Sequence, residues 1–224
     1  MGGIYKCKDK YEIDLDGYVL NYCEIEGNPN ATMTALVIGN IWANGLNFPL
    51  HNDFERFLID TKIKVLNPNV TFIVQRYYQK YLYDTPIEQI LEHPEFKHWN
   101  KILGTIQNHT SAIIMNKEQI SFPIDVTQDY IRRRNNNLTI ETRLKTPHNS
   151  ATLEKWLTSL NCSKCGFFDY REAFCDRYYC NIVDNITGLP LYRDKEHISP
   201  IGLRYLKPLI DSAINETLKI HAKI

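Results

Sequence analysis

A short apolar run that ends in glycine, Thr34-Ala35-Leu36-Val37-Ile38-Gly39, constrains the fold of this chain more than any other feature. A run without polar alternation is typical of a strand that is buried on both faces of a parallel sheet. Parallel neighbours need crossover connections, which are usually helices. Four further segments are predicted as strands: residues 62–66, 70–75, 112–115 and 166–170.

The segments between these runs carry helix signals. Asp84 and Pro86 supply a cap and an early proline, and Ser199-Pro200 does the same for a closing helix that Pro208 kinks or interrupts. The polar residues 132–137 are expected to form an exposed loop, and residues 1–30 an N-terminal lead-in. The helices predicted before the closing one span residues 45–60, 84–92, 98–107 and 151–160.

Strands that alternate with helices predict an α/β fold, specifically a three-layer αβα sandwich with a central parallel sheet. A chain of 224 residues with 43% hydrophobic content can bury one sizeable core, so residues 1–224 are expected to form a single domain. The 26 basic residues equal the 26 acidic ones, which argues against a nucleic-acid partner. The sequence contains neither an apolar segment long enough to span a membrane nor the apolar core of a signal peptide.

Two features nevertheless favour the secretory lumen or the cell exterior. The first is an excess of Asn-x-Ser/Thr sequons, where roughly two are expected by chance. The second is an even number of cysteines, as a disulfide framework requires. The candidate glycosylation sites are Asn30, Asn69, Asn108, Asn137, Asn161, Asn185 and Asn215. The candidate disulfide cysteines are Cys7, Cys23, Cys162, Cys165, Cys175 and Cys180.

Both features have an alternative explanation. An asparagine-rich composition inflates the number of sequons. The last four cysteines form two close pairs and could instead hold a tetrahedral zinc ion, although the Cys175-x4-Cys180 spacing is looser than a typical zinc ribbon. Disulfides are the preferred interpretation, and no metal or cofactor is expected.

The stretch Arg193-Asp194-Lys195-Glu196-His197-Ile198-Ser199-Pro200-Ile201-Gly202 is the best candidate for chemistry. An aspartate three residues before a histidine, on a turn that enters a helix, can accept the proton of one ring nitrogen while the other nitrogen faces a cleft. Taken alone, the same pair also fits an ordinary surface interaction.

Three stretches together resemble the SGNH domain that is fused to membrane acyltransferase-3 proteins, especially the nematode O-acyltransferase-like group. They are Ala35-Leu36-Val37-Ile38-Gly39, Cys162-Ser163-Lys164-Cys165-Gly166-Phe167-Phe168-Asp169-Tyr170, and residues 192–202. The resemblance implies a flavodoxin-like SGNH fold, an ancestry in O-acyl transfer or ester hydrolysis, and a former attachment to a membrane acyltransferase domain. It also implies that Asp194 orients His197 and that His197 is the general base.

The resemblance further implies a missing nucleophile. In that family the first strand runs into a serine, whereas this chain has Ile41 at that position, after the oxyanion or cleft candidates Gly39 and Asn40. Isoleucine has no hydroxyl and cannot form an acyl-enzyme, so catalysis is expected to be impaired or absent. Two alternatives remain at this point. Ser111 or Thr110 could supply the hydroxyl, or His197 could activate water directly.

A second set of residues concerns ligand binding. Arg76, at the end of a predicted strand, lies where such a sheet opens its cleft, and it either contacts substrate or pairs with a carboxylate. Tyr77, Tyr78, Tyr81 and Tyr83 could stack on sugar rings or complete the core. The alternative functions are therefore a non-catalytic module that binds an acylated glycan or lipid, and a purely structural lumenal domain.

Overall fold

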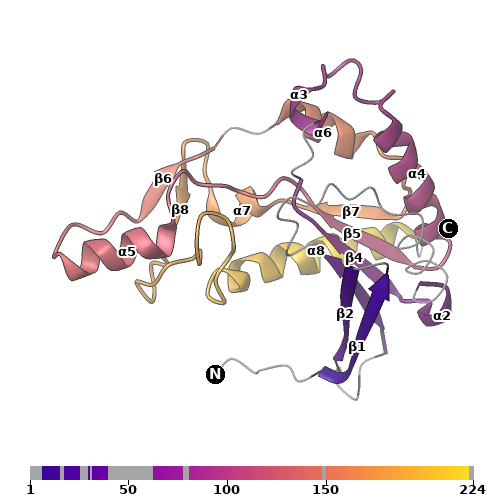
Figure 1. Ribbon diagram of the computed structural model, residues 1–224, viewed down its shortest axis with the longest axis horizontal. Helices are drawn as coiled ribbons and strands as arrows, with labels where there is room; N and C mark the ends of the chain where they lie inside the picture. The colour runs from indigo at the N-terminus through magenta and orange to yellow at the C-terminus, as the bar shows by residue number, and fades with distance from the viewer. Residues whose placement is uncertain are drawn as a thin grey trace.

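The computed structural model (Figure 1) describes residues 7–15, 18–25, 30, 32–39, 63–77, 81–147 and 150–221. Residues 7–15 and 18–25 are described by their backbone alone. The predicted helix at residues 45–60 lies outside these ranges.

A parallel sheet forms the centre of the described fold. Its strands are β3 (Ala35–Gly39), β4 (Val70–Val74), β5 (Ala112–Asn116) and β7 (Cys165–Phe168), in the spatial order β3-β4-β5-β7. All neighbouring pairs are parallel, with Gly39 opposite Val74 and Ile73 opposite Met115. Four of the five predicted strands are thus confirmed. Because the strands are parallel, the sheet has an amino edge, where all of them begin, and a carboxyl edge, where all of them end.

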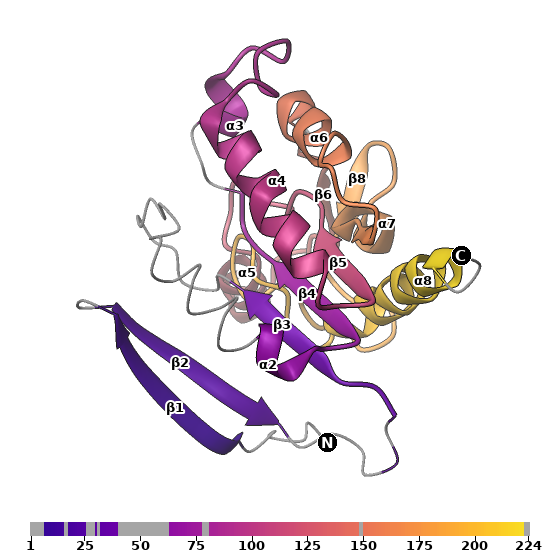
Figure 2. The same cartoon turned by 90° about the vertical axis from the view of Figure 1, so that its right-hand side faces the viewer.

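Helices cover both faces of this sheet, as Figure 2 shows. Helices α4 (Pro94–Gln107) and α6 (Ala151–Thr158) pack on one face together with Ile113 and Met115, and α8 (Leu203–His221) packs on the other with Ala112 and Ile114. This alternation along β5 follows the two-residue period of a strand. The predicted αβα sandwich is therefore confirmed.

Gly166 in β7 allows α8 to approach the sheet closely. A Cβ atom at this position would lie 2.1 Å from Thr217 Oγ1 and 3.3 Å from the carbonyl oxygen of Ala213, both on α8. A larger residue at this position would require the Thr217 side chain or the helix to shift.

Smaller elements surround the sandwich. The predicted lead-in contains an antiparallel hairpin of β1 (Cys7–Leu15) and β2 (Tyr18–Ile25). Strands β6 (Arg143–Lys145) and β8 (Tyr179–Asn181) pair antiparallel. The remaining helices are α2 (Lys64–Leu66), α3 (Tyr81–Asp84), α5 (Val126–Asn135) and α7 (Tyr170–Phe174).

The predicted strand at residues 62–66 is wrong, because this segment contains the helical turn α2. Its β-branched residues favour a strand, yet of the described residues 63–66 only Ile63 is buried, and Val65 is 71% exposed. Asn67, with φ of 40°, ends the helix in the left-handed conformation, and Pro68 follows it.

Two helix predictions also need correction. The helix predicted over residues 84–92 is wrong, because α3 ends at Asp84 and turns follow. Pro86 disfavours the helical conformation of the residue before it, so Asp84-Thr85-Pro86 marks a helix end. The helix expected at residues 98–107 begins earlier, at Pro94, where the ring of His93 accepts a hydrogen bond from the Glu95 N–H.

The predicted loop at residues 132–137 is wrong as well, because its first part is the last turn of α5. Val126 is the only residue of this helix that is buried, so α5 lacks the apolar periodicity by which helices are usually found. It is stabilised by local polar contacts instead. Asp125 caps it through the N–H of Gln128, and Asp129 pairs with Arg133 at 2.6 Å.

The structure describes two disulfides, Cys162–Cys165 and Cys175–Cys180. The zinc alternative is therefore wrong for these four cysteines, and no potential metal cluster occurs among the side chains that the structure describes. The side chains of Cys7 and Cys23 lie outside that part. Disulfides persist in oxidising compartments, so they indicate a non-cytosolic location. None of the described helices is both long enough and apolar enough to span a membrane.

Candidate functional site

The turn that carries Asp194 and His197 is held at both ends. Tyr192 and Ile198 form an antiparallel bridge, and the Arg193 N–H donates to the carbonyl oxygen of His197 at 2.7 Å. Tyr192 is 1% exposed, and its ring meets Phe122 edge-on with centroids 4.9 Å apart. The Thr127 hydroxyl also donates to the Tyr192 carbonyl at 2.6 Å. A buried aromatic anchor therefore fixes the start of the turn.

Within this turn, Asp194 and His197 form a directed pair. His197 Nδ1 lies 2.7 Å from Asp194 Oδ2, and the backbone N–H groups of Glu196 and His197 both donate to Asp194 Oδ1 at 2.9 Å. Because an ionised carboxylate can only accept, Nδ1 must carry the proton, and the neutral ring keeps its lone pair on Nε2. Both side chains remain accessible, with 42% of His197 and 40% of Asp194 exposed.

The surroundings favour the ionised form of Asp194. Partial burial acts to raise the pKa of Asp194, but the hydrogen bonds from the His197 and Glu196 N–H groups and from the imidazole outweigh it. The net pKa lies below the usual value for an aspartate. Asp194 is consequently charged at neutral pH and can stabilise a protonated His197 ring.

Contacts with the segment that follows β5 place this turn at the carboxyl edge of the sheet. The Phe122 N–H donates to the Lys195 carbonyl at 2.9 Å, and Gln119 Nε2 donates to the Glu196 carbonyl at 3.0 Å. The Ser121 hydroxyl reaches the Glu196 carboxylate at 2.9 Å. These anchors, which sequence reasoning missed, join residues more than seventy positions apart.

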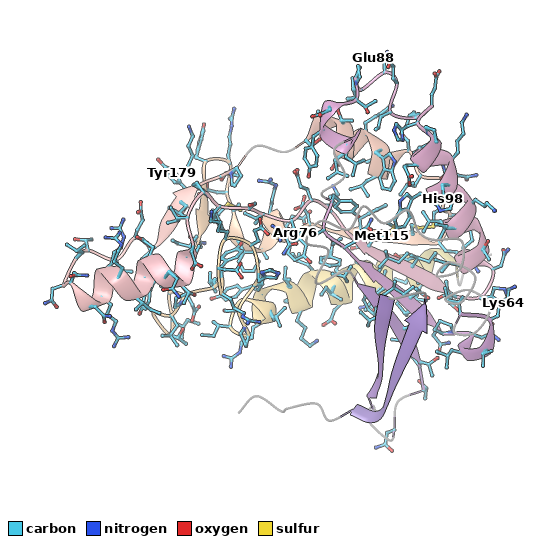
Figure 3. The ribbon with its side chains drawn as sticks, in the orientation of Figure 1. Lys64, Arg76, Glu88, His98, Met115 and Tyr179 are labelled. Carbon is cyan, nitrogen blue, oxygen red and sulfur yellow. A yellow bond between two sulfur atoms is a disulfide. The ribbon has the colours of Figure 1, made fainter. Side chains whose placement is uncertain are left out.

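Arg76 joins the same turn to β4. It lies two residues beyond the end of this strand, as labelled in Figure 3. Its guanidinium forms an ion pair with Glu196. Burial lowers the pKa of Arg76, while the negative charge of Asp194 opposes the shift. The observed partner is a carboxylate, which is one of the two roles expected for Arg76. A contact with substrate stays a prediction.

The nucleophile position can be located only through its strand. Gly39 ends β3 at the carboxyl edge, next to the last residue of β4, whereas Asn40 and Ile41 lie outside the described residues. The alternative hydroxyls are at the other end. Ser111 and Thr110 immediately precede β5, a five-residue strand that spans about 16 Å. They belong to the amino edge, so neither can attack a substrate that is held beside His197.

Asn116, at the end of β5, is a carboxyl-edge residue that the sequence pattern did not reveal. It is fully buried, and its amide donates to the carbonyls of Gln75 and Lys117 and accepts from the Gln75 N–H, all at 2.8 Å. It thereby locks the ends of β4 and β5 together. A single polar residue that closes an apolar strand is the signal that could have revealed it.

The tyrosines that were predicted to stack on sugar rings differ in their burial. Tyr77 is 3% exposed, donates to the Asn116 carbonyl at 2.8 Å and packs edge-on against Trp156, so it belongs to the core and cannot stack on a sugar. Tyr83 is half exposed, and burial together with nearby Glu118 raises its pKa. Tyr78 and the Tyr81 side chain lie outside the described part.

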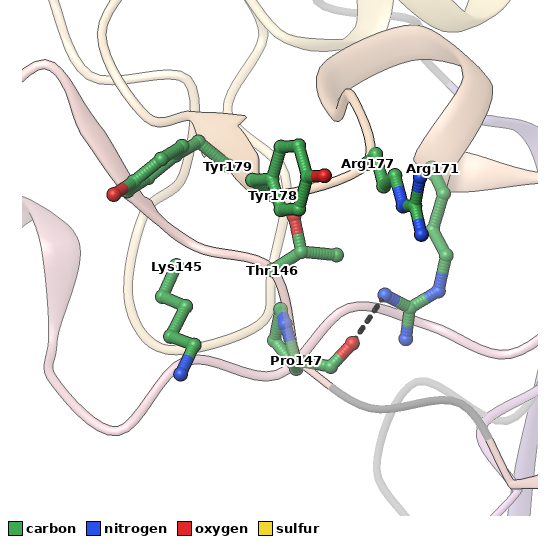
Figure 4. A pocket seen from close by; sticks show the side chains of 7 residues that line it. All are labelled: Lys145, Thr146, Pro147, Arg171, Arg177, Tyr178 and Tyr179. Carbon is green, nitrogen blue, oxygen red and sulfur yellow. Dashed lines mark hydrogen bonds between the residues drawn. The ribbon is translucent and has the colours of Figure 1, made fainter.

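A basic and aromatic pocket lies near the Cys175–Cys180 disulfide (Figure 4). Arg171 Nη1 donates to the Pro147 carbonyl at 2.8 Å, and its Nη2 lies 4.0 Å from a carboxylate oxygen of Glu118. The buried Nε makes no hydrogen bond within the described structure. Asp176 shapes the loop by accepting hydrogen bonds from the N–H groups of Tyr178 and Tyr179, both at 2.8 Å. These bonds lower the pKa of Asp176 to about 2. The lining residues are Lys145, Thr146, Pro147, Arg171, Arg177, Tyr178 and Tyr179.

The profile of the family described as "SGNH domain (fused to AT3 domains)" matches residues 50–212. The chain therefore belongs to this family of SGNH domains that are associated with acyltransferases, and the resemblance seen in its sequence is confirmed. Among solved structures, the chain is similar to the periplasmic domain of the lipopolysaccharide acetyltransferase of Salmonella ser. Paratyphi A, with 12% identity and a TM-score of 0.49. The match covers 74% of this chain and 62% of that domain, hence less than two thirds of it. No curated protein matches the chain.

Proposed function

We propose that this SGNH domain derives from a membrane-attached O-acyltransferase or esterase and keeps only the acid-base half of its site. Asp194 is the orienting acid, His197 is the base, and Ile41 stands at the nucleophile position. The observation that carries the proposal is the 2.7 Å contact between His197 Nδ1 and Asp194 Oδ2 in a turn anchored at the carboxyl edge. The chain's membership of the SGNH family supports it.

In this arrangement Asp194 and His197 are oriented for proton transfer, but the proposed nucleophile position holds an isoleucine. The ionised Asp194 fixes the tautomer of His197, which leaves Nε2 to take a proton from a nucleophile in the cleft. A serine there would attack an acyl ester and carry the acyl group as a covalent intermediate. Isoleucine cannot do so, and removal of a triad nucleophile lowers turnover on the order of a millionfold.

Hydrolysis of p-nitrophenyl acetate tests this proposal. The unchanged protein should show no hydrolysis above buffer, and Ile41→Ser should create hydrolysis that a second change, His197→Ala, removes. His98→Ala is the matched control, because His98 lies on α4, away from the carboxyl edge, and it should leave the new activity intact. Hydrolysis by the unchanged protein that disappears with His197→Ala would show that the natural site is active.

A second candidate function is non-catalytic binding of a glycan or lipid head group. The pocket in Figure 4 favours it, since Lys145, Arg171 and Arg177 gather around the exposed rings of Tyr178 and Tyr179. Cations beside aromatic rings suit an anionic sugar or head group. On an array of sialylated and neutral glycans, binding should favour the sialylated ones, fall with Arg177→Ala and be unaffected by His197→Ala. Equal signals from both classes of glycan would argue against this function.

The compartment belongs to the same proposal. The two disulfides and the seven sequons support the secretory lumen or the cell exterior, where an acylated glycan or lipid would be the substrate or ligand.

A further inference from the structure

Every strand of the parallel sheet is preceded by a sequon. Asn30 lies five residues before β3, Asn69 directly before β4, and Asn108 and Asn161 each four residues before β5 and β7. Because the four strands are parallel, these four asparagines belong to one edge of the sheet, the amino edge. In the sequence they are separated by as many as 131 residues, so only the fold brings them together.

The surface positions of these asparagines suit a bulky modification. Asn30, Asn108 and Asn161 are exposed, and Asn69 is half-buried. Asn69 Oδ1 accepts a hydrogen bond from the Thr34 N–H at 2.8 Å. A glycan is attached through Nδ2 and leaves the amide carbonyl in place, so this contact is compatible with modification.

A fifth sequon approaches the same edge from α8. Asn215 is exposed, and its neighbours Ala213 and Thr217 are the residues that pack against Gly166, near the start of β7. The other two sequons, Asn137 and Asn185, are also exposed but lie near α5. Asn137 follows the end of that helix, and Asn185 belongs to the turn whose Gly188 carbonyl accepts from Tyr130 of α5 at 2.8 Å.

The carboxyl edge shows the opposite pattern. Residues 117–125 and 189–202, which build the Asp194–His197 turn and its anchors, contain no asparagine at all. Glycans on the carboxyl edge would cover the candidate site, whereas glycans on the amino edge leave it open.

We propose that the amino edge of the sheet is an N-glycosylated face, modified at Asn30, Asn69, Asn108 and Asn161. The co-substrate is an oligosaccharide on a lipid pyrophosphate. The asparagine Nδ2 attacks the anomeric carbon of the first sugar, the bond from that carbon to the phosphate oxygen breaks, and the lipid pyrophosphate leaves. Nδ2 loses one proton to a base of the transferase, and no oxidant or reductant is needed. The modified face cannot serve as a docking surface for a partner protein.

Peptide mapping of the secreted chain tests the proposal. The chain is produced in eukaryotic cells behind a cleavable leader and treated with peptide N-glycosidase, which converts each glycosylated asparagine to aspartate. All four amino-edge asparagines should be converted. Single changes Asn69→Gln, Asn108→Gln and Asn161→Gln should each remove the mass of one glycan. Asn136→Gln, at an exposed asparagine outside any sequon, should remove none.

Secreted protein with both described disulfides formed but with unmodified asparagines at the amino edge would overturn the proposal. Glycans confined to Asn137 and Asn185 would overturn it equally. Neither result depends on catalysis, so the glycosylated face and the proposed acid-base function can fail separately.

Discussion

The two edges of the central sheet differ in what their loops carry. Loops at the carboxyl edge hold charged and hydrogen-bonded side chains that converge on one turn, where Arg76, Gln119 and Ser121 all contact Glu196. Loops at the amino edge are short and hold a sequon before every strand. The sheet thus separates an edge where side chains converge from an edge that we propose carries glycans.

This difference follows from the geometry of a parallel sheet. Ligands of open α/β sheets bind outside the carboxyl ends of the strands, where loops from several strands can converge on one point. The loops at the other edge return the chain from a helix to the next strand and have no such role. The comparison predicts that changes at the carboxyl edge alter chemistry, whereas changes at the amino edge alter stability or modification.

The largest expected effect concerns Asp194 in a protein that has regained a nucleophile. In the Ile41→Ser background, Asp194→Asn should lower kcat for p-nitrophenyl acetate by about 10⁴-fold, because an amide no longer fixes the His197 tautomer. The Asp194 carboxylate also accepts hydrogen bonds from two backbone N–H groups, and the substitution alters this acceptor. Circular dichroism is therefore needed as a control, and it should show that the variant is still folded. An unchanged kcat would mean that Asp194 does not orient His197.

A glycan moved to the carboxyl edge should have the next largest effect. Gln119→Asn creates an Asn-Ile-Ser sequon beside the Asp194–His197 turn by a single substitution. In the Ile41→Ser background, the glycosylated form should lose most of its activity, since the sugar covers the cleft. The same preparation after enzymatic deglycosylation is the control, and its activity should return. Equal activity before and after deglycosylation would place the cleft elsewhere.

The pattern of apolar runs predicted the αβα layers well, because a strand that is buried on both faces, such as β4 or β5, is a run of mostly apolar residues. The spacing of Asp194 and His197, three positions apart on one turn, likewise predicted the contact between them. Local patterns failed where long-range contacts decide the outcome. The ion pair of Arg76 with Glu196 spans 120 positions, and no spacing rule reveals it. Helix α5 was missed for a different reason, because its stability comes from caps and ion pairs and not from an apolar face.

An amino-edge change should affect stability and leave chemistry alone. Gly166→Ala would place a Cβ atom 2.1 Å from Thr217 Oγ1, which itself donates to the Ala213 carbonyl at 2.7 Å and cannot move freely. We expect the free energy of unfolding to fall by about 1–3 kcal/mol, as for other overpacked cores. Urea denaturation of protein made without glycans measures it. Adding Thr217→Ala should restore part of the loss, and no restoration would mean that the contact with α8 is not the cause.

The smallest expected effect is a pH dependence at the carboxyl edge. The pKa of Asp194 is lower in the folded protein than its usual value near 3.8, so its contribution to stability is present above that value and is lost as the pH falls through the folded pKa. Asp194 is partly exposed, and solvent keeps this contribution small. Compared by urea denaturation, the unchanged protein should be more stable than Asp194→Asn at pH 6, and the gap should narrow as the pH approaches 3. A gap that stays constant over this range would show that the charge of Asp194 does not stabilise the turn.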